Sequence, residues 1–358
     1  MLWRRLIRIP LEFTMHRRAV YFSALFVLFA AVLTPTAQLK AQNLTLEGYT
    51  GGFITPTAYV VYSEKGHTFS HPAVAYHFLD ANAVIGDIHT FGIAEGFANR
   101  AEVSYGRNVH VTGDSALFSS LWHFAGMNVF AGKVVAIKDG QFRTWVPGVA
   151  VGGIARTSDK FVSSPAAQLA VESYDEECIT TKLCAPVPIP AAKAYSNGDV
   201  YAVATKTWLK PPVPFLVTLG YKFTNAEILG IGGQATRFGG RLFGGLGIPL
   251  PGPWKTAIVP SAGFMQEPKQ VQNLSGILVA PPTYTPPSPA HIPTTLDYAI
   301  RVTQREHPHF SFDIGVGQVA GNIGTTLVPT GIPASPYAPV AVNLQARHVV
   351  GTGLSYRY

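Results

Sequence analysis

Three side chains in the first third of the chain, Ser104, His89 and Glu102, are of the types that build a hydrolytic triad. Such a triad is recognised by the geometry of its members, and the sequence supplies only their composition. A barrel enzyme acting on lipid or polysaccharide would need these groups to converge near one rim. We expect no enzymatic activity.

Among the eleven histidines are two pairs, His71 with His77 and His307 with His309, and each pair shares one face of an expected strand. A metal centre needs three or four convergent ligands, so one strand supplies half of a site at best. The glycine-rich run 237–247 alternates like a strand and no helix signal follows it, which argues against a phosphate-binding loop. We therefore predict no metal and no cofactor.

Charged residues fall on one parity of the expected strands, opposite the apolar residues. Side chains alternate across a strand, and the polar face of a membrane barrel faces its lumen. The predicted lumen-lining residues are Arg100, Glu102, Lys222, Arg237, Arg241, Asp297, Arg301, Asp313, Arg347 and Arg357. This excess of basic residues either biases a wetted passage toward anionic or polar solutes, or consists of charges that pair and hold the barrel closed.

Short alternating segments position these residues. The clearest is 215–223, where Phe215, Val217, Leu219, Tyr221 and Phe223 share one face. Further strands are expected around 66–78 and 101–105, and over Ala83–Ile93, Leu117–Phe124, Met127–Ile137, Arg143–Arg156, Val200–Leu209, Arg237–Ile248, Trp254–Phe264, Leu296–Gln304, Phe310–Ala320 and Leu344–Tyr358. Bacterial single-chain barrels close on an even number of strands, so we predict 12 to 14 strands. If the pattern has missed one strand, we expect it at 228–233.

This pattern predicts an all-β fold, a transmembrane antiparallel up-and-down β-barrel occupying residues 66–358 after a turn segment at 42–65. Charged residues make up 13% of the chain, and no apolar run after the leader could span a membrane as a helix. Three long, Pro-rich connections interrupt the strands at 157–199, 266–294 and 322–343, and one of them could instead enter the lumen as a plug. The alternative fold is a soluble β-sandwich, which also scatters aromatic residues along strands.

The first 41 residues have the form of a secretory signal peptide: a basic segment, an apolar run at 19–33, and a small residue, Ala41, at the expected cut. Met15 offers a second start, and a retained membrane anchor is the alternative. Six basic residues and one acid in this leader account for +5 of the formal +7, which leaves about +2 for the mature chain. That balance is too weak to indicate nucleic acid.

The two cysteines, Cys178 and Cys184, are separated by five intervening residues in one expected loop. An exported protein reaches an oxidising compartment, so we predict a disulfide, with two free thiols as the alternative.

The chain ends on alternating residues and two tyrosines, Tyr356 and Tyr358, and this ending resembles the assembly signal of bacterial outer-membrane barrels. The stretch G-Y-T-G-G-F-I-T-P-T-A at 48–58, with F-G-I-A-E-G-F-A-N-R-A-E-V-S-Y-G at 91–106, resembles the start of outer-membrane barrels that include an exopolysaccharide-associated group. The resemblance implies a barrel in the bacterial outer membrane, with membrane lipid, the barrel-assembly machinery and polar solutes or polysaccharide as partners.

The expected function is a non-enzymatic, porin-like or polymer-handling channel for polar or anionic solutes. The alternative is a structural or adhesive surface barrel that binds partners through its long loops.

Overall fold

Twelve antiparallel strands close into a barrel in the computed structural model, with one short extra strand beside them. The structure describes residues 43–81, 86–111, 126–159, 176, 180, 194, 196–209, 214–231, 233–268, 294–304, 309–320, 322–329, 337–343 and 348–357. In this described part the chain contains no apolar helix of membrane-spanning length. The predicted all-β barrel and its strand number are confirmed.

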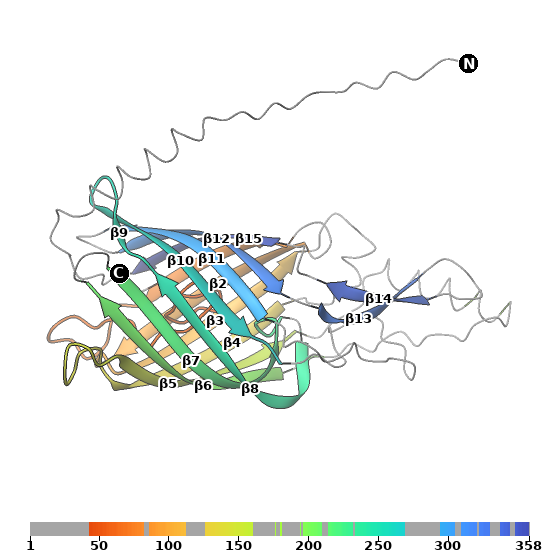
Figure 1. The fold of residues 1–358 in the computed structure, drawn as a ribbon, viewed down its shortest axis with the longest axis horizontal. Helices are drawn as coiled ribbons and strands as arrows, with labels where there is room; N and C mark the ends of the chain where they lie inside the picture. The colour runs from red at the N-terminus through yellow and green to blue at the C-terminus, as the bar shows by residue number, and fades with distance from the viewer. Residues whose placement is uncertain are drawn as a thin grey trace, which may run out of the picture. The chain divides into compact units, whose positions relative to one another are not determined.

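Each barrel strand pairs with its neighbour in sequence, and the last strand pairs with the first (Figure 1). The barrel strands are β1 (Ala73–Asp80), β2 (Asp87–Phe97), β3 (Ala101–Val111), β4 (Gly126–Ile137), β5 (Gly148–Ser158), β6 (Ser196–Trp208), β7 (Phe215–Glu227), β8 (Gly233–Gly247), β10 (Thr256–Gln266), β11 (Thr294–Gln304), β12 (Phe310–Ala320) and β15 (His348–Arg357). The short β9 (Leu250–Pro251) pairs with β10, and β13 (Asn322–Pro329) and β14 (Tyr337–Asn343) form a separate hairpin.

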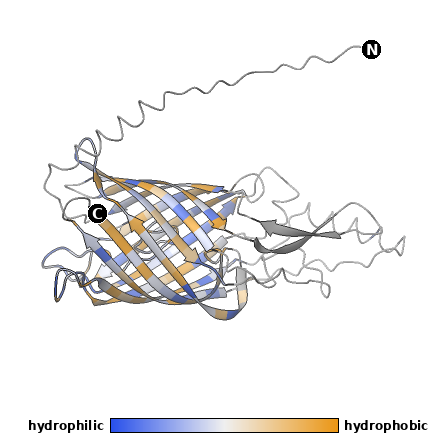
Figure 2. Cartoon of the chain, in the orientation of Figure 1, coloured by the Kyte–Doolittle hydropathy of each residue, from blue (hydrophilic) through white to orange (hydrophobic). Residues whose placement is uncertain are grey.

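Alternating side chains explain the closed sheet. Along β7, Val217, Leu219, Tyr221 and Phe223 are exposed, whereas Thr218, Lys222 and Thr224 are buried. Figure 2 shows apolar and polar residues alternating along the barrel strands. Closure gives every barrel strand two hydrogen-bonded neighbours, so no strand edge is left open in an apolar surrounding.

The two ends of the barrel differ. At one end, which we call the turn end, β1 begins and β15 finishes, and the strands are joined by short connections such as 98–100 and 209–214. At the other, the loop end, the long connections 112–125, 159–195, 267–293 and 321–347 join the strands, together with the short connections 81–86 and 228–232. The predicted long connections therefore all belong to one end.

Several strand boundaries differ from the expected ones. Residues 228–231 form a turn, in which Ile228 and Leu229 have positive φ, so the additional strand predicted there is wrong. Trp254 and Lys255 also have positive φ and turn the chain before β10. Residues 66–72 precede β1 rather than opening it, and the predicted strand 117–124 lies outside the described residues.

Candidate functional site

The lumen of the barrel holds residues 43–63, which we call the plug. All of its residues are buried or half-buried, and Tyr49, Phe53 and Ile54 are at most 3% exposed. The plug folds on itself through backbone hydrogen bonds such as Thr45 N to Tyr49 O, at 2.7 Å. The segment expected to be an ordered turn before the barrel thus fills the barrel interior.

The plug approaches the wall most closely where both carry glycine. Gly48 has a φ of 90°, a conformation that other residues adopt at a cost. A Cβ on Gly92 of β2 would lie 2.6 Å from the Gly48 Cα, and one on Gly106 of β3 would lie 2.4 Å from the Glu47 carbonyl oxygen. A side chain at position 92 or 106 would therefore not fit, and the two glycines form a seat for residues 47 and 48 of the plug.

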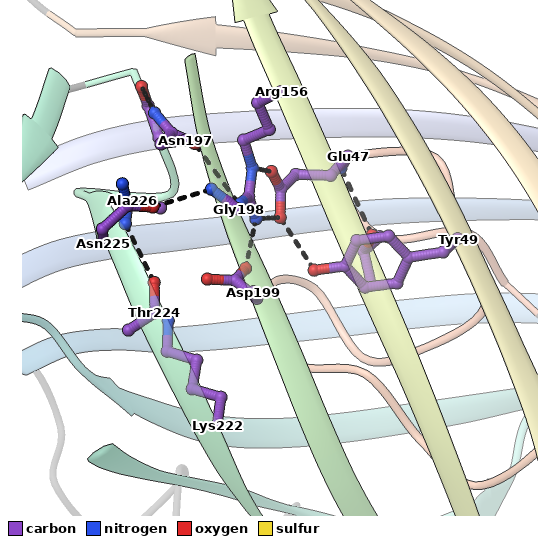
Figure 3. A network of polar contacts seen from close by, with 12 residues as sticks. Glu47, Tyr49, Arg156, Asn197, Gly198, Asp199, Lys222, Thr224, Asn225 and Ala226 are labelled. Atoms are coloured by element: carbon purple, nitrogen blue, oxygen red, sulfur yellow. Dashed lines mark hydrogen bonds and ion pairs between the residues drawn. The ribbon is translucent and has the colours of Figure 1, made fainter. Parts of the chain in front are cut away.

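The strongest polar anchor joins Glu47 to Arg156 of β5 (Figure 3). The guanidinium donates from Nε and Nη2 to the two carboxylate oxygens, the second bond measuring 2.9 Å. Nη2 also donates to Asp199 Oδ2 of β6 at 2.7 Å, and the Tyr49 hydroxyl donates to Glu47 at 2.8 Å. Arg156 and Glu47 are at most 3% exposed, so this pair is shielded from water and salt.

Next to this anchor lie further charged wall residues that pair with one another and not with the plug. Lys222 of β7 lies 3.9 Å from a carboxylate oxygen of Glu267, which follows β10. The Thr295 hydroxyl donates to the other Glu267 oxygen at 3.1 Å. The wall thus carries two bases, Arg156 and Lys222, and two acids, Asp199 and Glu267, in one buried group.

A second anchor surrounds Glu102 of β3. Its carboxylate accepts from the backbone N of Thr50 (2.9 Å), the Thr50 hydroxyl (2.6 Å) and the backbone N of Val61 (2.8 Å). Lys133 of β4 lies 3.5 Å from the same carboxylate and donates to the backbone oxygens of Thr50 and Thr57 at 2.8 and 3.1 Å. Two opposite wall charges therefore hold the plug through its backbone.

The plug is also tied at the turn end. The amide of Ala58 donates to the Thr205 hydroxyl at 2.9 Å, and the Tyr59 hydroxyl donates to Asp139 at 2.8 Å. Asn99, in the β2–β3 turn, accepts from the Ser63 amide at 2.7 Å and donates to the Ser63 carbonyl at 3.0 Å. The chain leaves the lumen here before β1 begins.

The start of the plug contacts another wall pair. Asn43 bonds to the carboxylate of Asp313 and accepts from the hydroxyl of Ser311, both on β12. Arg301 of β11 donates to the other Asp313 oxygen at 2.7 Å. Asp313 is 1% exposed. Its charge is balanced inside the barrel by the ion pair with Arg301.

Apolar packing adds to these polar anchors. Leu46, Tyr49, Phe53 and Ile54 join a buried cluster with the wall side chains Ile88, Met127, Val129, Ile154, Tyr201, Val203, Phe243 and Met265. Burying one large apolar side chain is worth about 1.5 to 3 kcal/mol. The seated state is therefore favoured by packing as well as by charge.

The predicted lumen residues separate into two groups. Glu102, Lys222, Asp297 and Asp313 point inward and are at most 3% exposed. Arg301 pairs with Asp313, and Arg241 donates to the Glu267 carbonyl at 2.8 Å.

The remaining predicted lumen residues lie toward the rims. Arg100, in the β2–β3 turn, donates to the carbonyls of Val135 and Ala136 at 3.3 and 3.2 Å. Arg237 is exposed, and Arg357 lies over the Tyr62 ring at 5.8 Å. Arg347, Cys178, Cys184 and Tyr358 lie outside the described residues.

The hypothetical triad does not form. Ser104 and Glu102 share the inward face of β3, whereas His89 is on the outward face of β2, where its Nδ1 lies 2.7 Å from the Tyr76 hydroxyl. The histidine is on the wrong parity of its strand, and that parity was readable from the sequence. His77 is buried in the lumen, whereas His71 is exposed before β1.

Sequence reasoning missed the residues that hold the plug most firmly. Arg156, Lys133 and Asp199 occupy the inward parity of β5, β4 and β6, so the alternation rule applied to every strand would have found them. Glu47 gave a weaker signal, as the one charged residue of segment 43–63. The pairing of Glu47 with Arg156 had no signal, because 109 residues separate the two.

One surface ion pair lies at the loop end. Arg107 of β3 donates to both oxygens of Asp159, which follows β5, at 3.0 and 2.5 Å. This hydrogen bonding lowers the pKa of the Asp159 carboxyl below its ordinary value. Both side chains are about one third exposed, at 30% and 36%, so the pair contributes little to stability.

No family model matches the sequence, and no curated protein matches it. Among solved structures, the KdgM porin is 9% identical with a TM-score of 0.39, and the match covers 80% of this chain and 99% of that one. The NanC porin is 8% identical with a TM-score of 0.39, covering 80% and 100%. The Acinetobacter baumannii outer membrane protein Omp33 is 8% identical with a TM-score of 0.34, covering 81% and 99%. These neighbours are outer-membrane barrel proteins, and likeness at this level supports no inference about function.

Proposed function

We propose that this protein is a porin-like channel of the bacterial outer membrane for polar solutes, held closed by its plug. The loop end faces the cell exterior and the turn end the periplasm, since long connections of such barrels face outward. Outer-membrane lipid surrounds the apolar coat, and the barrel-assembly machinery inserts the chain through its terminal strand.

The observation that carries the proposal is the pairing of wall charges with one another. Glu102 lies beside Lys133, Asp313 beside Arg301, and Lys222 beside Glu267. In these anchors the plug contributes one charged side chain, Glu47, whose partner Arg156 also pairs with Asp199. Removing one partner of a buried ion pair leaves an uncompensated charge, which is costly. These wall charges keep their wall partners when the plug withdraws, so the open lumen has a polar wall with its charges balanced.

This balance bears on solute preference. The predicted excess of bases came from Arg100, Arg237, Arg347 and Arg357, of which the first two and the last lie at turns, rims or exposed positions. The buried wall adds two acids, Asp199 and Glu267, and two bases, Lys133 and Arg156, so these additions restore no excess of bases. We therefore propose that the open lumen accepts polar solutes in general. Any preference for anions would come from individual basic residues and not from the net charge of the wall.

Planar-bilayer conductance of the full chain tests the proposal. The variant Gly92→Ala with Gly106→Ala places two Cβ atoms against the seat of residues 47 and 48, and we expect it to open where the wild-type protein stays closed. The matched control is Gly132→Ala with Gly317→Ala, where the nearest atoms to an added Cβ lie at 3.7 and 4.0 Å. A folded Gly92→Ala, Gly106→Ala barrel that never conducts would refute the channel.

The apolar contacts of Phe53 and its neighbours favour a second candidate, a structural or adhesive barrel whose plug never leaves. In that case every variant stays closed in the bilayer, and deletion of residues 322–343 abolishes binding to a surface partner without any change in permeability. Conduction by the seat variant excludes it.

A further inference from the structure

We propose that the place now occupied by the Glu47 carboxylate is a binding site for the carboxylate of a passing solute when the plug is withdrawn. The inference rests on the proposed channel function and adds the chemical class of one solute group and the residue that binds it. Arg156 is that residue, with Asn197 and Asp199 holding it in place.

The donor geometry of Arg156 matches a carboxylate. Its Nε and Nη2 donate side by side to the two Glu47 oxygens, as an arginine fork does to a carboxylate. The remaining partners of the guanidinium belong to the wall: Asp199 accepts from Nη2 at 2.7 Å, and Asn197 Oδ1 lies 3.5 Å from Nη1. These wall contacts fix the plane of the guanidinium independently of the plug.

The turn between β7 and β8 also supports Arg156. The Asn197 amide donates to the carbonyl of Gly230 at 3.1 Å, in the turn between β7 and β8. A Cβ on Gly230, which has a φ of 81°, would lie 2.4 Å from Arg156 Cδ. The turn therefore packs directly on the arginine side chain.

Withdrawal of the plug removes both Glu47 bonds and leaves Nε without a partner from the wall. The wall group of Arg156, Lys222, Asp199 and Glu267 is then neutral in formal charge. A bound carboxylate restores the formal charge that the same group has now with Glu47 in place. The plug thus occupies the site with the same chemical group that the open channel would bind.

The test uses potassium glucuronate as the carboxylate, with glucose and potassium chloride as controls at matched concentration. In the open Gly92→Ala, Gly106→Ala channel we expect glucuronate to produce resolved blocking events. Loss of two charge-assisted hydrogen bonds in the added change Arg156→Gln should shorten these events about tenfold or more. An open channel that glucuronate blocks no more than glucose does overturns the site and leaves the channel function intact.

A second measurement decides the case in which the seat variant stays closed. Glucuronate competing with Glu47 for Arg156 should accelerate amide hydrogen exchange of residues 43–50 in the wild-type protein, and neither glucose nor chloride should do so. If exchange there is the same in all three solutions, the carboxylate site is wrong. Failure of the channel function is recognised separately, by a folded Gly92→Ala, Gly106→Ala barrel that never conducts.

Discussion

Glu47→Gln tests whether the buried ion pair holds the plug in the barrel. Glutamine keeps the size of the side chain and one oxygen, so the substitution removes the charge and one of the two acceptors of Arg156. Each hydrogen bond to a charged group contributes about 1.5 to 3 kcal/mol. Because Arg156 keeps Asp199, we expect the plug to lose about 2 to 3 kcal/mol, below the roughly 3 to 5 kcal/mol for a pair broken without a substitute.

Amide hydrogen exchange measures this loss locally. A change of 1.4 kcal/mol alters an equilibrium about tenfold, so exchange of residues 43–50 should become about 30 to 150 times faster. Amides of strands β10 to β12 should exchange at the wild-type rate, because the hydrogen-bond partners of Arg156 in the described part of the chain, Glu47, Asn197 and Asp199, lie outside these strands. The control is Glu64→Gln, the same change at an exposed residue just beyond the plug, which should have no effect.

The reasoning fails in two distinguishable ways. If the plug amides of Glu47→Gln exchange within about threefold of the wild-type rate, the ion pair does not hold the plug and apolar packing alone does. If the barrel strands accelerate together with the plug, the plug and barrel open as one unit, and a plug that leaves a standing barrel is excluded.

Two further predictions concern the rims. Asn99→Ala removes both hydrogen bonds to Ser63 and places alanine at a φ of 52°, so we expect a loss of about 2 to 3 kcal/mol in urea unfolding of the detergent-solubilised protein. Asn99→Asp should lose less, because it keeps the acceptor for the Ser63 amide and tolerates positive φ; equal losses in the two variants would refute this reasoning. The Asp159 carboxylate, whose pKa is lowered by Arg107, stabilises the fold above the ordinary carboxyl pKa of about 3.9, and this contribution disappears as the pH falls through the lower folded pKa. In urea unfolding, Asp159→Asn should therefore cost less than about 1 kcal/mol relative to the wild-type protein at pH 6 and less again at pH 3, and an equal cost at both pH values would refute the assignment.

The sequence determined the barrel because its information is local. Alternation along 215–223 specifies which side chains face lipid and which face inward, and that assignment needs only the two-residue period of a strand. The outward Val217, Leu219 and Tyr221 and the inward Lys222 follow from it directly. Boundaries were less certain where a turn has an apolar sequence, as in 228–231, since positive φ at Ile228 and Leu229 leaves no pattern in the residue types.

The tertiary structure alone decided what fills the lumen. The stretch 43–63 reads as a glycine-rich turn, and nothing in its composition distinguishes a periplasmic extension from a plug. Its place depends on contacts between residues far apart in the chain, such as Glu47 with Arg156 and Asn43 with Asp313, separated by 109 and 270 residues. Charge pairing is a property of distance in space, so the sequence could identify the inward charges of the wall but not their partners.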